Sequence, residues 1–201
     1  FTGQGIGTAS ANRVLVIGVG WACTSPTGRL LSSITVDGVN ATLINSTAST
    51  LGDPGTSWGF ILWPTGTTAD IVVTTDTVST IETVIVVWAM TDGSKIPFQA
   101  AADGTPASNA FSVVLDIPAG GVAVGLVVSL GTGPITWAGL TEVVDGAVTT
   151  LDYGAASDNF STEQVDLTIS ATYGTSTDGA LSTRSLSAAS VWFTVTEPFT
   201  F

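Results

Sequence analysis

The side chains of this chain best suited to chemistry are its carboxylates. Glycosidic bond hydrolysis uses two carboxyl groups that face each other across the substrate, and the chain holds 16 Asp and Glu residues. Two of the candidates, Glu82 and Glu163, stand near the starts of predicted strands among polar residues, where a solvated carboxylate is the default. The full set of candidates is Glu82, Glu142, Glu163, Glu197, Asp116 and Asp166. A carboxylate-based glycosidase or lyase is therefore a weaker hypothesis than either of the two non-enzymatic functions given at the end of this section. We predict no catalytic residue.

Other catalytic classes lack their side chains. The chain has no histidine and one cysteine, which excludes Ser-His-Asp and Cys-His nucleophiles as well as zinc and iron–sulfur sites built on His or several Cys. Cys23 follows an apolar run, so we expect a buried, inert thiol. The glycine-rich segment Gly3–Gly7 precedes no predicted helix and is not a phosphate-binding loop. We expect it to form a flexible arm, and we predict no cofactor.

Two segments offer hard oxygen ligands for calcium. These are the stretch Asp152–Asn159, which we expect to form a loop, and the turn at Asp53-Pro54. Neither has the ligand spacing of a known calcium loop. The sequence favours solvated turns, and we predict no metal site.

Aromatic residues are the second group that could bind a ligand. Of six tryptophans, Trp21, Trp88 and Trp192 lie in or at the end of apolar strands and are expected in the core. The others border turns, where an exposed ring could stack on a sugar or a second subunit, although packing remains the favoured role. The C-terminal tail adds two phenylalanines that could pack on a neighbour. The candidates for a ligand or subunit contact are Trp58, Trp63, Trp137, Phe199 and Phe201.

Charge limits the partners. The formal net charge is −12, and the four basic residues are Arg13, Arg29, Lys95 and Arg184. This balance repels nucleic acid phosphates and anionic membranes. No apolar run reaches the roughly 18 residues of a membrane helix, so we expect a soluble mature chain without membrane insertion. An acidic surface keeps a protein soluble and monodisperse.

The elements that must position these groups are strands. Short β-branched runs alternate with Gly, Pro, Asp and Ser, as is typical of strands and turns. The run Arg13–Trp21 is apolar on both faces, which indicates a central strand covered on both sides, and Asp37-Gly38 predicts a hairpin turn within Ser33–Ile44. Further strands are expected at 58–63, 69–74, 80–90, 111–117, 122–130, 135–144, 148–153, 163–173 and 187–196. About eleven strands predict an all-β fold, an antiparallel, jelly-roll-like β-sandwich.

The domain organisation follows from the same pattern. The polar stretch Thr91–Asn109 is expected to be a long loop or a domain boundary. The two halves of the sequence lack convincing internal repetition, so one sandwich over residues 12–198 is favoured over two modules. An extended arm, residues 1–11, would precede it, and a short aromatic tail, residues 199–201, would follow.

Several strand segments together resemble a known type of module. They are NRVLVIGVGW, SITVDGVNATLI, WGFILWPTGTTADIVVTT, TIETVIVVWAM, and VAVGLVVSLGTGPITWAGLTEVVDG continuing to AASVWFTVTEP. They are similar to a jelly-roll-like β-sandwich module of phage and environmental-bacterial proteins, over about Asn12 to Pro198. That module usually has a further strand before the segment equivalent to NRVLV. Here only residues 1–11 precede it, which leaves open a strand supplied by a partner or by exchange.

The resemblance implies a structural role, since the module has no catalytic motif. Such modules occur in virion fibres, capsid decoration and surface adhesins. We therefore expect a non-enzymatic virion structural protein, a capsid decoration (cement) or fibre protein, located on a virion surface or outside the cell. Its partners would be copies of itself and a major capsid or other virion protein. The alternative is a carbohydrate-binding adhesin or receptor-binding module whose partner is a glycan.

Overall fold

Strands are the only regular secondary structure in the part of the chain that the structure describes. The computed structural model describes residues 1–23, 31–48, 54–75, 80–92, 97–104, 108–187, 190–195 and 199–200. No helix in these residues is long and apolar enough to cross a membrane. The strands are β1 (Gln4–Gly5), β2 (Arg13–Cys23), β3 (Leu31–Val36), β4 (Val39–Asn40), β5 (Thr42–Ala48), β6 (Gly55–Leu62), β7 (Thr68–Ala69), β8 (Ile71–Thr75), β9 (Thr80–Thr91), β10 (Gln99–Asp103), β11 (Ser108–Ile117), β12 (Gly121–Ser129), β13 (Thr136–Ala138), β14 (Glu142–Val148), β15 (Leu151–Phe160), β16 (Gln164–Thr177), β17 (Gly179–Ser187), β18 (Ser190–Val195) and β19 (Phe199–Thr200).

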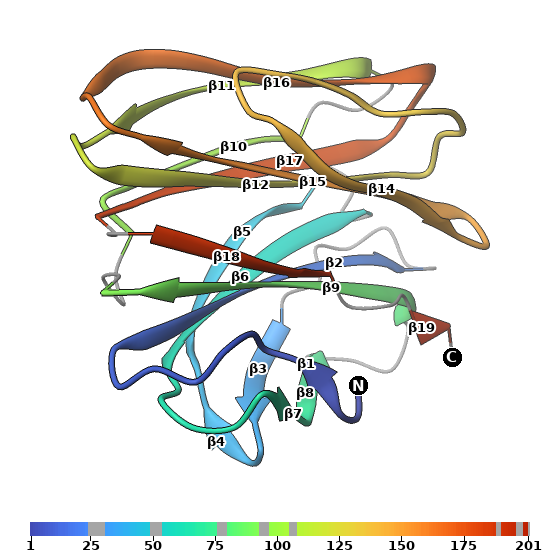
Figure 1. Ribbon diagram of the computed structural model, residues 1–201. Coiled ribbons are helices and arrows are strands. Elements are labelled where there is room, and N and C mark those ends of the chain that lie inside the picture. The colour runs from blue at the N-terminus through green and yellow to red at the C-terminus, as the bar shows by residue number, and fades with distance from the viewer. Residues whose placement is uncertain are drawn as a thin grey trace.

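The strands form four stacked layers (Figure 1). We number the sheets from the bottom of that view. Sheet I has the order β4-β3-β8, with the small β1-β7 pair beside it. Sheet II has the order β18-β9-β2-β6-β5, with β19 also paired to β9. Sheet III has the order β10-β17-β12-β15-β14, and sheet IV has the order β11-β16-β13. All pairings are antiparallel, so the expected all-β, sandwich-like fold is confirmed, whereas the finer jelly-roll expectation is not.

The two central sheets are covered on both faces. All eleven residues of β2 and all nine of β12 are buried. Alternate side chains of β2 point to opposite sides: Leu15 and Ile17 pack toward sheet I, and Val14 and Val16 pack toward sheet III. The expectation of a central strand over Arg13–Trp21 is therefore confirmed.

Three apolar layers hold the stack together. One fills the space between sheets I and II, another lies between sheets III and IV, and the middle layer joins sheets II and III. Val86 and Trp88 of β9 meet Val124 and Leu126 of β12 in that middle layer. Burial of apolar side chains at roughly 25 cal/mol per Å² is the main source of stability in such a core.

Glycine fixes two of the turns that direct the chain. Asp37 and Gly38 both have positive φ, at 45° and 81°, as the predicted two-residue hairpin requires. Gly139 has a φ of 84°, and a Cβ there would stand 2.4 Å from the carbonyl oxygen of Thr168. The chain bends at this glycine and passes from sheet IV to sheet III. The single strand expected over Ile135–Val144 is for this reason two strands, β13 and β14, in different sheets.

Three other expectations need correction. The stretch Thr91–Asn109 contains β10 and the start of β11, so it is not only a loop. The segment Asp152–Asn159 is part of β15, because its backbone pairs with β12 along its whole length. Within Val148–Tyr153 a turn at Thr149-Thr150 separates β14 from β15. The sequence also missed β17, whose Ser- and Thr-rich pattern lacks apolar alternation.

The first residues of the chain belong to the fold. Gln4 and Gly5 pair with Ala69 and Thr68, and Ile6 is fully buried. The buried Arg13 holds this segment in place: its guanidinium donates hydrogen bonds to three backbone carbonyl oxygens, those of Gly7, Trp63 and Thr65, at 2.8, 2.7 and 2.5 Å. Residues 1–11 are thus fastened to the turn after β6, in contrast to the flexible arm expected over Gly3–Gly7.

Candidate functional site

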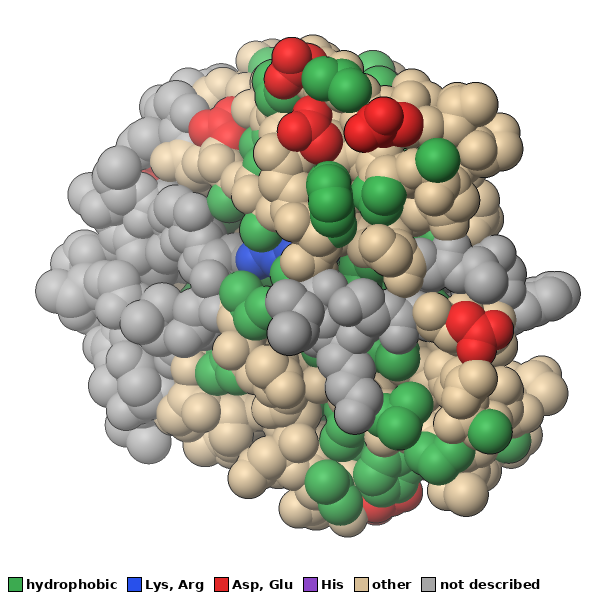
Figure 2. All heavy atoms as spheres, turned by 90° about the vertical axis from the view of Figure 1, so that its left-hand side faces the viewer, with side chains coloured by type: hydrophobic (Ala, Val, Ile, Leu, Met, Phe, Trp, Pro, Cys, Tyr) green, Lys and Arg blue, Asp and Glu red, His purple; other side chains and the backbone are tan. Residues whose placement is uncertain are grey.

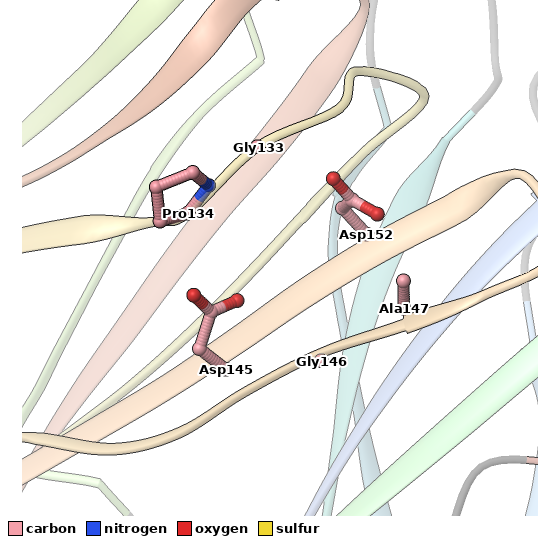
Figure 3. Close-up of a pocket in the computed structure, with 6 residues that line it drawn as sticks. All are labelled: Gly133, Pro134, Asp145, Gly146, Ala147 and Asp152. Atoms are coloured by element: carbon pink, nitrogen blue, oxygen red, sulfur yellow. The ribbon is translucent and has the colours of Figure 1, made fainter.

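The pocket with the most chemical character lies at one edge of sheets III and IV. It has a volume of about 260 Å³. Two carboxylates, Asp145 and Asp152, project from the β14–β15 hairpin toward the segment that carries Gly133 and Pro134 (Figure 3). The complete lining is Gly133, Pro134, Asp145, Gly146, Ala147 and Asp152.

Strand register brings the two carboxylates to the same face. Asp145 lies opposite Gly154, and Ala147 lies opposite Asp152. Because side chains alternate along a strand, Asp145, Ala147, Asp152 and Gly154 all face sheet IV. Gly154 leaves the space beside Asp145 open to the side chain of Ile135 and the indole of Trp137.

The electrostatics of the pair are asymmetric. Asp145 accepts a hydrogen bond from the backbone N–H of Ile135, at 3.0 Å. Burial raises the pKa of Asp152, the charge of Asp145 raises it further, and a hydrogen bond from the Gly133 backbone opposes both effects. Nearby, burial raises the pKa of Tyr173 well above its usual range, with smaller contributions from Asp152 and Asp145. The pair therefore carries a negative field that reaches into the layer between sheets III and IV.

This arrangement offers hydrogen-bond acceptors rather than a catalytic centre. Two carboxylates can accept bonds from ligand hydroxyl or ammonium groups, or supply hard oxygens to a cation. Within the described residues, no three Asp, Glu or Cys side chains come together in a way that could hold a metal ion. The Tyr173 hydroxyl is buried and does not line the pocket. The pocket thus contains a weak polar site, and we assign it no reaction.

Trp58, one of the expected contact residues, is in the core. Its ring is fully buried between sheets II and III, and its Nε1 donates a 2.8 Å hydrogen bond to Ser182 Oγ. Its ring centroid lies 5.4 Å from that of Trp88 and 5.5 Å from the guanidinium carbon of Arg184. The ring has no surface for a ligand or a subunit, because β6 lies between β2 and β5 and sheet III covers the face that carries Trp58.

Arg184 is itself notable, because a buried cation is costly unless it is hydrogen-bonded. Its Nη1 donates to the Thr183 carbonyl oxygen at 2.7 Å, and burial lowers its pKa to about 10. The guanidinium also lies over the Trp58 ring, where a cation–π contact adds to its stabilisation. Trp58 and Arg184 therefore act together as packing between the central sheets.

Trp63 and Trp137 are both half-buried. Trp63 packs against the layer between sheets I and II. Trp137 lies over Gly125 and Gly154 of sheet III, at positions where a Cβ would stand 3.0 and 3.2 Å from indole atoms. Of the expected contact residues whose side chains the structure describes, these two are partly exposed.

The remaining expected contact residues lie largely outside the described part of the chain. The backbone of Phe199 pairs with Thr83 in β19, which places the tail on sheet II. The side chain of Phe199 and the whole of Phe201 are outside the described residues, as is the side chain of Trp192. The expected core positions of Trp21 and Trp88 are confirmed, and so is the buried position of Cys23.

Of the candidate carboxylates that the structure describes, Asp116 and Asp166 are neighbours, but no candidate lines the pocket described above. Glu82 is buried, in contrast to the expected solvated position, and it accepts hydrogen bonds from the Thr150 backbone and hydroxyl. Asp116 accepts a bond from the Asp166 backbone N–H at 2.8 Å. Glu142 and Glu163 are exposed, and Glu197 and Asp53 lie outside the described residues. The two carboxylates that line the pocket are Asp145 and Asp152, and sequence reasoning missed Asp145. Its only signal was its position seven residues before Asp152 across a tight turn.

Comparison with known proteins gives no relative for this chain. No protein-family model matches it, and no curated protein or solved structure gives a significant match. The resemblance to virion and adhesin modules therefore remains a prediction. The functional argument must rest on the chain's own geometry.

Proposed function

We propose that this chain is a non-enzymatic structural protein of a virion or another extracellular particle, and that its copies associate with one another. A capsid decoration or fibre protein is the form favoured by the sequence. The observation that carries the proposal is a patch of small, uncharged side chains on the outer face of sheet IV of a strongly acidic protein.

The outer face of sheet IV consists of small side chains in cross-strand rows. Thr172 lies between Ala110 and Thr136 in one row, and Ser170 lies between Ser112 and Ala138 in the next. Val114, opposite Thr168, is 49% exposed. We call these eight residues the sheet IV face: Ala110, Ser112, Val114, Thr136, Ala138, Thr168, Ser170 and Thr172.

Charge makes this face the place where two copies can meet. With a net charge of −12, two molecules repel each other wherever their carboxylates approach. Asp116 and Asp166 lie in the row next to Val114 and Thr168, and Asp103 accepts a hydrogen bond from the Ser112 backbone N–H at the other edge of β11. Seen from the side of the stack, acidic side chains gather near the top of the molecule (Figure 2). The uncharged patch between these carboxylates is where two copies meet with the least repulsion, and its Ser and Thr hydroxyls can form hydrogen bonds.

The size of the face sets the strength of the contact. Three strands about 4.8 Å apart and about five residues long cover roughly 250 Å². A standard stable interface buries about 800 Å² on each partner. A single contact through this face is accordingly weak in dilute solution, and it becomes effective when copies are held side by side on a particle, by effective concentration.

Sedimentation of the purified protein tests this contact. We expect self-association that grows between micromolar and millimolar concentration and is abolished by Ser112→Glu together with Thr172→Glu. Thr67→Glu is the matched control, because Thr67 is also exposed but lies on the turn before β7 at the other end of the stack. If the wild-type protein stays monomeric throughout, or if the control variant dissociates equally, self-association through this face is wrong.

A second candidate, glycan binding, is favoured by the partly accessible rings of Trp63 and Trp137. Sugar rings stack on exposed indoles. The Asp145–Asp152 pocket, in the same half of the protein as Trp137, offers acceptors for sugar hydroxyl groups. Intrinsic fluorescence during titration with a broad glycan panel tests this idea. A response that disappears in Trp63→Ala or Trp137→Ala supports it, and no response to any glycan removes it.

A further inference from the structure

The two halves of the chain repeat one strand order. In sheet II the central strand β2 lies between β9 and β6, and β5 follows β6 at the edge. In sheet III the central strand β12 lies between β17 and β15, and β14 follows β15 at the edge. In chain order, β2, β5, β6 and β9 thus correspond to β12, β14, β15 and β17.

The outer sheets repeat in the same way. β3 and β13 each follow the central strand of their half, and each pairs with the strand that precedes β9 or β17, namely β8 or β16. On the other side of that strand lies the segment that precedes the central strand. This is β11 beside β16 and, in the first half, β1 beside β7, with Phe1 and Ile71 exchanging backbone hydrogen bonds. Among the described strands, β4, the second arm of a hairpin, and β19, which pairs with β9, have no counterpart.

The register of the pairings also repeats. Each central strand pairs with both neighbours over eight residues without a bulge, and when Val14 is aligned with Val122 the same alternate positions of both strands face the middle layer. The first and last matched sets are Val14, Leu62 and Met90 with Val122, Asn159 and Leu186, and Trp21, Gly55 and Thr83 with Ser129, Asp152 and Gly179. The common strand order and the common layers indicate a repeat, and the regular pairing of the two central strands agrees with both.

The last strand of each half breaks the pattern in a reciprocal way. β10 follows β9 along the chain but pairs with β17 of the second half. β18 follows β17 but pairs with β9 of the first half. Both occupy the same edge position of their sheets. We infer that the chain consists of two copies of one sandwich unit that have exchanged their final strands, as two subunits of a strand-swapped dimer do.

The exchange makes each half the partner of the other. Sheet III is completed by a strand that leaves the first half, and sheet II by a strand that leaves the second. The apolar layer between sheets II and III is then the interface between the two units. The units have also diverged, because Trp21 fills the space over Gly55 whereas its counterpart Ser129 lies opposite Asp152, at the acidic pocket.

Cleaving the link between the halves tests the inference. A specific protease site inserted after Gly104, between β10 and β11, allows the folded full-length protein to be nicked. We expect the two fragments to elute together at the size of the intact protein, since each holds a strand in the other's sheet. The comparison is the same nicked protein without residues 190–201, which removes β18 and β19; its fragments should dissociate at a lower denaturant concentration, because one of the two exchanged strands is lost while β10 remains in sheet III. Fragments that separate as two folded proteins, or a truncated protein that stays as tightly associated as the nicked full-length protein, would overturn the inference.

A disulfide gives an independent test that needs no cleavage. Ala101 of β10 lies opposite Thr183 of β17, so Ala101→Cys with Thr183→Cys, in a Cys23→Ala background, should form a bond between the halves. Exchange within one chain predicts oxidised protein of monomer mass on a denaturing gel. Covalent dimers would show that β10 pairs with another molecule, and the inference would then be wrong for a single chain.

Discussion

Replacing Gly55 should test how the central sheets obtain their packing density. Gly55 begins β6 opposite Trp21, whose ring is fully buried. A Cβ at position 55 would stand 2.4 Å from Cζ2 and 2.7 Å from Cε2 of that indole. Both distances are far inside van der Waals contact, so the ring must move within a filled core. We expect Gly55→Ala to lower the free energy of unfolding by about 1–3 kcal/mol, the usual cost of overpacking.

The same geometry predicts that the cost disappears when the ring is removed. Trp21→Ala leaves a cavity and should cost about 3–5 kcal/mol on its own. In that background the new methyl group enters empty space, so Gly55→Ala should be neutral or stabilising. The coupling between the two changes should therefore be about 1–3 kcal/mol, as expected for residues in contact.

Urea unfolding followed by far-ultraviolet circular dichroism measures all four proteins of this cycle without relying on tryptophan emission. Gly174→Ala in β16 is the matched control, because the nearest atom to its Cβ would be the Thr132 carbonyl oxygen at an ordinary 3.4 Å. The control should be near neutral. If Gly55→Ala costs nothing, or costs the same with and without Trp21, the argument for ring-over-glycine packing is refuted.

Three further predictions concern two buried ionisable groups, Arg13 and Glu82, and the half-buried Asp152. Arg13→Met leaves the carbonyls of Gly7, Trp63 and Thr65 without their donor. It should lower the free energy of unfolding by at least about 2 kcal/mol and speed amide hydrogen exchange in residues 4–7. Unchanged exchange there would contradict the role of Arg13 in holding this segment. Glu82→Gln weakens the hydrogen bonds from Thr150 and should lower the free energy of unfolding by about 1–2 kcal/mol. The exposed Glu142→Gln should change it very little. Equal losses for the two variants in denaturant titrations would contradict a stabilising link between Glu82 and Thr150. Because burial and Asp145 raise the folded-state pKa of Asp152, its ionisation opposes folding, so stability from this group should rise as pH falls through that pKa and level off below the unfolded value of about 3.9; Asp152→Asn should remove this dependence in unfolding midpoints measured against pH, and an unchanged pH profile would contradict it.

The sequence predicted the local structure well where burial has a simple pattern. The run Val14–Trp21 is apolar at every position, as expected for a strand covered on both faces, and the Asp37-Gly38 turn is specified by the two residues that tolerate positive φ. Both signals are local and need no knowledge of the partner strand.

The missed features depend on partners distant in the sequence. β17 contains Ser182, Thr183, Arg184 and Ser185, which look like exposed residues but are buried. Ser182 is satisfied by Trp58, 124 residues away. The Asp145–Asp152 pair, the buried Glu82 and the exchanged strands likewise follow from strand register and sheet order. The periodicity of side chains along one strand contains no information on the register of its pairing or on the order of strands in the sheet.

The proposed structural role is tested most directly by counting copies in purified particles. Quantitative mass spectrometry of virions or other particles from the source of this protein should find the chain at a fixed ratio to the most abundant shell protein, near one to one for capsid decoration and much lower for a fibre. Its absence from every particle fraction, with the protein recovered only free in the medium, would contradict the account.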